Sequence, residues 1–111
     1  MAKAIFKLNV DCGRMGDLEG LFVAEKDHVE KLINDGIEVY FGEVLGKHSE
    51  ICGAIEQKEI TLVSDSVEAI QVIESLGLES GYNPFDYTAI NVEDDEDDLT
   101  VLEIVVKRLN Q

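Results

Sequence analysis

Two predicted strands at the N-terminus, separated by a turn, constrain the fold more than any other feature of the sequence. Residues 3–10 alternate polar and apolar side chains, so that the apolar positions share one face of an extended chain. Residues 11–17 contain two glycines, which adopt positive φ at little cost and favour a turn. Residues 18–24 are again mostly apolar. Two such segments on either side of a short turn predict a β-hairpin.

Two later segments have the apolar spacing of amphipathic helices. Residues 25–34 carry acids in the first turn, where the helix dipole favours negative charge, and a glycine follows the segment. Its expected buried face consists of Val29, Leu32 and Ile33. A second helix follows the N-cap candidates Asp65 and Ser66, runs to about Leu76 and stops at Gly77. Its expected buried face consists of Val67, Ile70 and Ile73.

Further strands are predicted at 37–45, 50–56, 59–64 and 88–92 from short apolar or alternating runs bounded by turn residues. The last segment, 99–109, has two interpretations. Acids at its start and two bases at its end match a helix dipole, whereas its β-branched residues favour a strand. We expect a helix, and its predicted buried face consists of Leu99, Leu102, Val106 and Leu109.

This order of elements predicts an α+β fold. We expect a mainly antiparallel sheet of about five strands, with two to three helices packed on one face, in the order ββαβββα plus a C-terminal element. The expected organisation is an α+β domain at 1–92, an acidic linker at 93–98, and a C-terminal helix or strand at 99–111 that packs on the same domain. No apolar run approaches the roughly 18 residues of a membrane span, and we expect a cytoplasmic protein with two free cysteines.

The charge of the chain bears most directly on function. Its 111 residues include 24 Asp and Glu against 9 Lys and Arg, a net charge of -15. Such a field repels nucleic acid and anionic membranes and attracts basic partners. Six carboxylates follow one another without a break, namely Glu93, Asp94, Asp95, Glu96, Asp97 and Asp98. This run is interpreted either as a solvated linker or as a docking strip for a basic protein; a calcium-binding EF-hand is excluded because no glycine follows Gly81.

A second candidate for partner contact is the loop 80–87, which contains three aromatic residues and the only proline. Its candidate contact residues are Tyr82, Asn83 and Tyr87, because rigid aromatic side chains supply large contact area at low entropic cost. The alternative is that Phe85 and one tyrosine only close the edge of the core.

Three basic side chains are candidates for holding a small anionic ligand, namely Arg14, Lys47 and His48. The segment 42–49 superficially suggests a phosphate loop, but it has three residues between its glycines where the motif has four, and His48 follows the lysine. The two cysteines and two histidines lack the spacing of a zinc site, and nothing indicates a catalytic Cys–His pair. We expect neither enzymatic activity, nor a metal, nor a cofactor.

The sequence therefore predicts a small acidic, non-enzymatic binding or inhibitory protein that occupies a basic partner surface. In charge and size, though not in any motif, it is comparable to immunity proteins and to phage-borne antagonists of nucleases. One alternative is an anionic-ligand-binding protein or enzyme with a site near the loops 13–16, 46–49 and 82–87. Another is a structural homo-oligomer.

Overall fold

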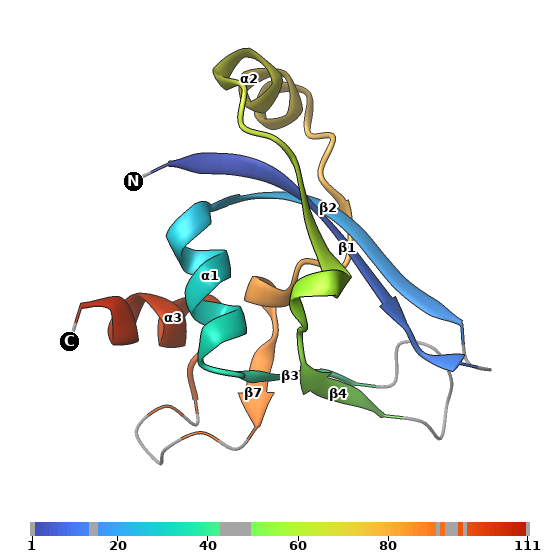
Figure 1. Cartoon of the computed structure of the whole chain (residues 1–111), viewed down its shortest axis with the longest axis vertical. Coiled ribbons are helices and arrows are strands. Elements are labelled where there is room, and N and C mark those ends of the chain that lie inside the picture. Colours follow the sequence, from blue (N-terminus) through green and yellow to red (C-terminus); the bar gives the residue numbers. More distant parts are fainter. Residues whose placement is uncertain are drawn as a thin grey trace.

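The computed structural model describes residues 2–13, 16–42, 50–90, 92, 96 and 98–110. Within this part the chain forms seven strands in two antiparallel sheets and three α-helices (Figure 1). The first sheet has the order β5-β1-β2-β6 and the second the order β4-β3-β7. The strands are β1 (Lys3–Asp11), β2 (Asp17–Glu25), β3 (Glu38–Gly42), β4 (Ile51–Ala54), β5 (Ile60–Ser64), β6 (Ser80–Gly81) and β7 (Thr88–Ile90). The helices are α1 (Lys26–Asn34), α2 (Val67–Leu76) and α3 (Val101–Leu109), with short 3-10 turns η2 (Gln57–Glu59) and η3 (Pro84–Asp86).

The α+β class and the antiparallel pairing are confirmed, but the expectation of about five strands in one sheet is wrong. The predicted strands 50–56 and 59–64 are not neighbours, because η2 separates β4 from β5 and the two strands join different sheets. The helices also do not share one face. Helix α1 contacts α3 and β2, whereas α2 contacts β1 and projects away from the second sheet (Figure 1).

The predicted hairpin is confirmed and forms the centre of the first sheet. Strand β1 pairs with β2 without interruption, from Lys3 opposite Glu25 to Asp11 opposite Asp17. Alternate side chains of both strands point into the main core, which also receives residues from the second sheet, α1 and α3. The largest fully buried side chains in this part of the chain include Phe22, Leu8 and Leu18. The hairpin therefore supplies one wall of the core.

The last segment is a helix, as expected, but it buries the other face. The buried residues of α3 are Val101, Ile104 and Val105, whereas Leu102, Val106 and Leu109 of the predicted face are 37–40% exposed. Leu99 precedes the helix and packs partly on the core. The reason lies at the N-terminal end of α3. There Thr100 forms a capping box with Glu103, and the Val101 amide donates a hydrogen bond to the Tyr87 carbonyl at 2.7 Å. These contacts fix which face turns toward the core.

Helix α2 has the predicted ends but not the predicted burial. The Ser66 side chain accepts a hydrogen bond from the Ala69 amide, and Gly77 ends the helix in the left-handed conformation at φ 63°. Of the expected face, Ile70 is buried, Ile73 is partly buried and Val67 is 68% exposed. None of the helices in the described ranges has the length and apolar character that crossing a membrane requires.

Candidate interaction surface

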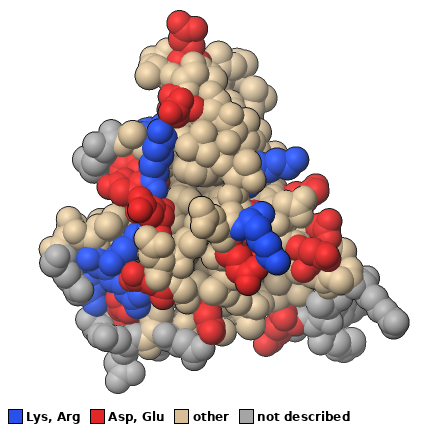
Figure 2. All heavy atoms as spheres, viewed as in Figure 1, with Lys and Arg blue, Asp and Glu red and all other residues tan. Residues whose placement is uncertain are grey.

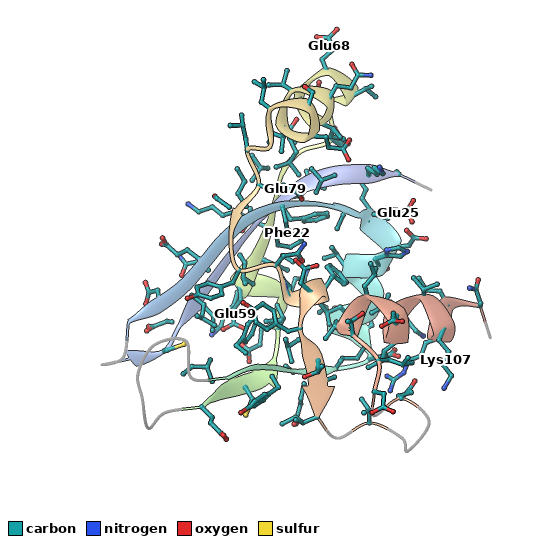
Figure 3. The ribbon with its side chains drawn as sticks, turned by 180° about the vertical axis from the view of Figure 1, so that it is seen from behind. Phe22, Glu25, Glu59, Glu68, Glu79 and Lys107 are labelled. Carbon is teal, nitrogen blue, oxygen red and sulfur yellow. The ribbon has the colours of Figure 1, made fainter. Side chains whose placement is uncertain are left out.

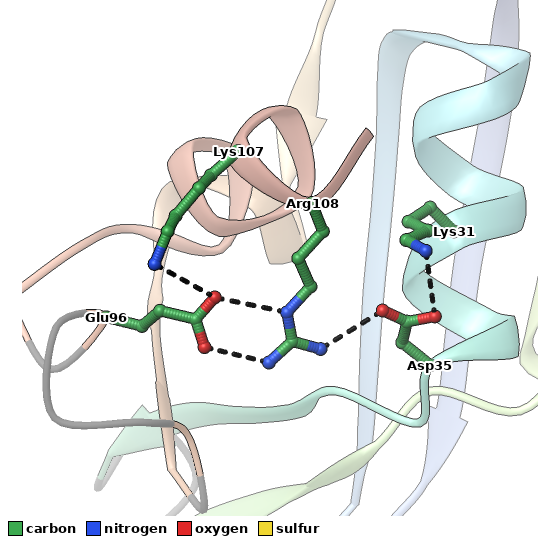
Figure 4. A network of polar contacts seen from close by, with 5 residues as sticks. All are labelled: Lys31, Asp35, Glu96, Lys107 and Arg108. Carbon is green, nitrogen blue, oxygen red and sulfur yellow. Dashed lines mark hydrogen bonds and ion pairs between the residues drawn. The ribbon is translucent and has the colours of Figure 1, made fainter. Parts of the chain in front are cut away.

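The acidic run is not uniformly exposed, because Glu96 lies inside the protein with only 3% of its surface accessible. The Arg108 guanidinium donates to both of its carboxylate oxygens, at 3.1 Å from Nε and 2.9 Å from Nη2 (Figure 4). Lys107 approaches the same carboxylate at 3.7 Å. Asp98 is exposed, while Glu93, Asp94, Asp95 and Asp97 lie outside the described residues. The prediction that Glu96 belongs to an exposed docking strip is therefore wrong, since the two bases at the end of α3 enclose it.

Arg108 also connects this carboxylate to α1. Its Nη1 donates to Asp35 at 3.1 Å, and Asp35 is the C-cap residue of α1 and pairs with Lys31 at 3.3 Å (Figure 4). The hydrogen bonds to Glu96 and then Asp35 raise the pKa of Arg108 further above its usual value, although burial opposes them. A charged network therefore holds the chain segment before α3 against α1 and α3.

The aromatic loop contributes to the core on one side. Phe85 is 3% exposed and packs edge-on against Phe22, with ring centroids 6.1 Å apart. Tyr82 and Tyr87 are partly buried and pack on Phe41, at 6.3 and 4.8 Å between centroids. Burial, followed by the proximity of Tyr82 and Asp86, raises the pKa of Tyr87. The two tyrosines thus have a packing role, and their contact with a partner stays a prediction.

Two local features place this loop. The Asn83 side chain accepts a hydrogen bond from the Phe85 amide at 3.0 Å and caps η3, so Asn83 has a structural role as well. Strand β6 pairs Gly81 with Gly20 of β2. A Cβ at Gly20 would collide with the backbone of Tyr82, and one at Gly81 with the backbone of Glu19. Only glycine allows the two chains to approach so closely.

The three basic candidates Arg14, Lys47 and His48 lie outside the described residues. The described end of the hairpin beside Arg14 is anionic. Burial, followed by the charges of Asp11, Asp17 and Glu59, raises the pKa of the Cys12 thiol. A raised pKa keeps this thiol protonated and a poor nucleophile near neutral pH. Both cysteines are free; Cys12 is partly buried and Cys52 is exposed.

One group of side chains has ligand atoms close enough together for a metal ion. Atoms of Glu25, Asp27 and His28 lie within 4.8 Å of one another at the start of α1. His28 Nε2 pairs with Glu25 at 3.1 Å, and one buried Asp27 oxygen has no hydrogen-bond partner. The same residues have ordinary structural roles, because an acid in the first turn suits the helix dipole and His28 packs near Phe85.

Exposed apolar side chains gather in one part of the chain that the sequence did not single out. Of nine large hydrophobic side chains that are exposed in the described residues, six come from β5, α2 and the following loop. They are Leu62, Val63, Val67, Val72, Leu76 and Leu78, and four are at least half exposed. We call the exposed apolar side chains of residues 62–78 and the acids among and beside them the β5–α2 surface.

Carboxylates surround these apolar side chains. Asp65 pairs with Lys26 at 2.9 Å and Glu74 with Lys3 at 3.5 Å, while Glu79 accepts from the Val23 amide at 2.8 Å. Glu68 points away from the body of the protein at the outer end of α2 (Figure 3). On the face shown in Figure 2, the few Lys and Arg side chains lie next to carboxylates. The β5–α2 surface is therefore apolar with an acidic border.

The sequence of α2 indicates this surface, although the spacing of apolar residues along one face of the helix does not reveal it. Six of the ten residues of α2 are apolar, namely Val67, Ala69, Ile70, Val72, Ile73 and Leu76. They lie on several sides of the helix, and one sheet cannot cover them all. A helix that is apolar on most sides is typical of an element that is buried by a second surface.

Comparisons with protein-family models, with curated proteins and with solved structures found no match. The function is therefore inferred from the geometry of the described surface.

Proposed function

We propose that this chain is a small, non-enzymatic binding protein that covers a basic surface of a protein partner. The observation that supports it is the β5–α2 surface, where apolar side chains up to 68% exposed lie among carboxylates. Large exposed apolar patches commonly mark interaction sites, and here Val72 and Leu76, four residues apart, lie side by side on α2. Buried apolar anchors supply much of the affinity of such contacts, while charge selects the partner.

The charge of the chain defines the chemistry of the partner. A net charge of -15 favours association with a basic surface and slows the approach of nucleic acid or of a second copy. Several of the lysines already pair with carboxylates of the same chain, including Lys3, Lys26 and Lys58. A basic protein surface, such as a nucleic-acid-binding site, would meet carboxylates where it normally meets phosphates. An inhibitor of such a protein fits this arrangement.

The two other interpretations have less support. A site for an anionic ligand would need Arg14, Lys47 or His48, yet the described hairpin end beside Arg14 carries Asp11 and Asp17. In a homo-oligomer, two strongly negative chains would repel each other. The protonated Cys12 thiol also agrees with a protein that performs no nucleophilic chemistry.

The test is a capture experiment with two matched pairs of substitutions. The immobilised protein is exposed to a host lysate at low salt and eluted with a salt gradient. Val72→Gln with Leu76→Gln removes apolar surface from α2, and Leu102→Gln with Val106→Gln does the same on α3. We expect a basic protein to be retained by the natural chain and the α3 variant, lost by the α2 variant, and released by salt. Retention that ignores both salt and the α2 substitutions would contradict the proposal.

A further inference from the structure

Strand β5 is an edge of the first sheet. In the order β5-β1-β2-β6 it pairs only with β1, so within the described strands its other side faces no neighbour. Three consecutive residues, Thr61, Leu62 and Val63, are exposed, which an interior strand of a covered sheet would not show. An edge strand presents unpaired backbone N–H and C=O groups that a further extended chain can bind.

A depression lies on the inner side of this edge and is lined mainly by apolar side chains. It has a volume of about 410 Å³ and separates β5 from α1. The sheet contributes Phe6, Ile60 and Leu62, and the helix contributes Val29 and Ile33. Polar side chains complete the lining, namely Lys26, Glu30, Asn34 and Gln57. Leu62 is 45% exposed here, which is unusual for a side chain that points toward the core side of a sheet. The depression suits an apolar side chain from a neighbouring strand.

A second depression lies on the outer side of the same edge and is polar. It has a volume of about 590 Å³ and includes Thr61 of β5 with Asp11, Glu56 and Glu59. Lys7 and Lys58 also line it; Lys58 pairs with Glu56 at 3.4 Å, which leaves Asp11 and Glu59 against Lys7. After burial, the charges of Asp11 and Glu59 from this depression, together with that of Asp17, raise the pKa of the Cys12 thiol, in agreement with a negative potential there. This depression suits a basic side chain.

We propose that β5 binds an extended segment of the basic partner as an added strand, in which basic and apolar residues alternate. The inference rests on the proposed function and specifies how the partner is recognised. Successive side chains of a strand point to opposite faces, so an added strand would direct every second side chain into the acidic depression and the others into the apolar one. Backbone hydrogen bonds supply affinity, and the two depressions select the alternating sequence.

Charge argues against a second copy of this chain as the occupant. Two copies joined through antiparallel β5 strands would form one continuous sheet, with both outer depressions on the same face. With β5 paired along its whole length, Ile60 of one copy would lie opposite Ser64 of the other, so Glu59 of each copy would lie beside Asp65 of the other. A strand that carries lysine or arginine at those positions reverses the sign of this interaction.

The probe is a synthetic peptide of about eight residues in which lysine and valine alternate, long enough to pair along all of β5. Its control has the same composition, with lysines and valines in two separate blocks. We expect the alternating peptide to bind at least tenfold more tightly at low salt. Bound peptide should also slow hydrogen exchange of β5 backbone amides at least tenfold. N-methylation of every second residue of the peptide blocks backbone hydrogen bonding along one of its two edges. Of the two peptides made in this way, methylated at odd or at even positions, one should therefore lose binding.

Three substitutions test the two depressions separately. Leu62→Ala removes the side chain in the apolar depression and should weaken peptide binding about tenfold. Glu59→Gln removes a charge from the acidic depression while retaining the oxygen that accepts from the Glu56 amide, and should weaken binding several-fold at low salt. Glu50→Gln is the matched control, because this exposed acid precedes β4 in the second sheet and lines neither depression, and binding should not change.

The outcomes separate this inference from the proposed function. Equal binding of the alternating and block peptides, or no binding of either, would overturn the added strand even if the capture experiment yields a basic partner. Self-association of the protein, with protected β5 amides in the absence of peptide, would overturn it in favour of a second copy. If the capture experiment fails while the alternating peptide binds as expected, the edge-strand site stands and the proposed function does not.

Discussion

Arg108 holds the buried carboxylate of Glu96 with two parallel hydrogen bonds, at 3.1 and 2.9 Å. The two residues are twelve positions apart, and the pair joins the end of α3 to the chain segment that precedes the helix. Paired geometry of this kind is stronger than a single charged contact. One of six consecutive acids is thereby a structural residue, whereas Asp98 of the same run is exposed.

Replacement of Glu96 by glutamine should destabilise the fold. The substitution keeps the shape of the side chain but, among the described residues, leaves Arg108 with Asp35 as its charged partner. Loss of one member of a buried ion pair costs about 3 kcal/mol. Denaturant unfolding measures the loss, and Asp98→Asn, an exposed acid from the same run, should change the unfolding free energy by less than about 0.5 kcal/mol. Equal losses of unfolding free energy in the two variants would mean that the Glu96–Arg108 pair stabilises the fold no more than an exposed acid does.

Phe85→Ala and Tyr82→Ala should differ clearly in their effect on stability. Phe85 is buried against Phe22, and its removal leaves a cavity that costs about 3 kcal/mol or more. Tyr82 is only partly buried on Phe41, and we expect a loss of about 1 kcal/mol. Thermal unfolding of both variants provides the comparison. If Tyr82→Ala lowers stability as much as Phe85→Ala, the tyrosine belongs to the core and is a poor candidate for partner contact.

The hairpin and α1 were predictable because their signals are local. Alternation before a glycine turn and an apolar run after it predicted the pairing of β1 with β2, and Val29 and Leu32 of α1 are buried as the spacing indicated. The capping box of Thr100 and Glu103 is also a local sequence pattern, and it favours the helical interpretation of 99–109. Local chemistry therefore accounts for where most elements begin and end.

Long-range contacts decided what the sequence left ambiguous. Helix α3 has apolar residues on two faces, and the contact of Val101 with Tyr87 selects which one is buried. Strand β6 has only two residues, too few for a periodic pattern. The burial of Glu96 depends on a base twelve residues later, and no spacing rule connects the two. In α2 the apolar residues exceed what one contact can bury, so helical periodicity alone could not identify the buried face.

Cys12 should be the less reactive of the two cysteines because its thiol pKa is raised, first by burial and then by Asp11, Asp17 and Glu59. A higher pKa means that less thiolate is present at any given pH, so alkylation should begin at higher pH than for a thiol with an ordinary pKa. Replacement of Asp17 by asparagine removes one of the charges and should shift the rate profile of Cys12 toward lower pH. Alkylation with iodoacetamide, followed by mass spectrometry of each cysteine over a pH series, measures both effects. A profile unchanged in the variant would contradict the contribution of this acid.

Gly81→Ala should destabilise the crossing of β2 and β6 that holds the aromatic loop. Gly81 has φ 71°, where a side chain is strained, and its new Cβ would meet the backbone of Glu19. Strain of this kind costs about 1–3 kcal/mol before the collision is counted, so we expect a loss of at least about 2 kcal/mol. Ser80→Ala is the control, since it changes the adjacent exposed residue of β6 without a backbone requirement. Because β6 begins the segment that leads to Tyr82, Gly81→Ala should also change the environment of that tyrosine, which its ring proton resonances report. A variant as stable as the natural chain would show that β6 can separate from β2 at little cost, and that the other contacts of the loop, such as the packing of Phe85, are enough to hold it.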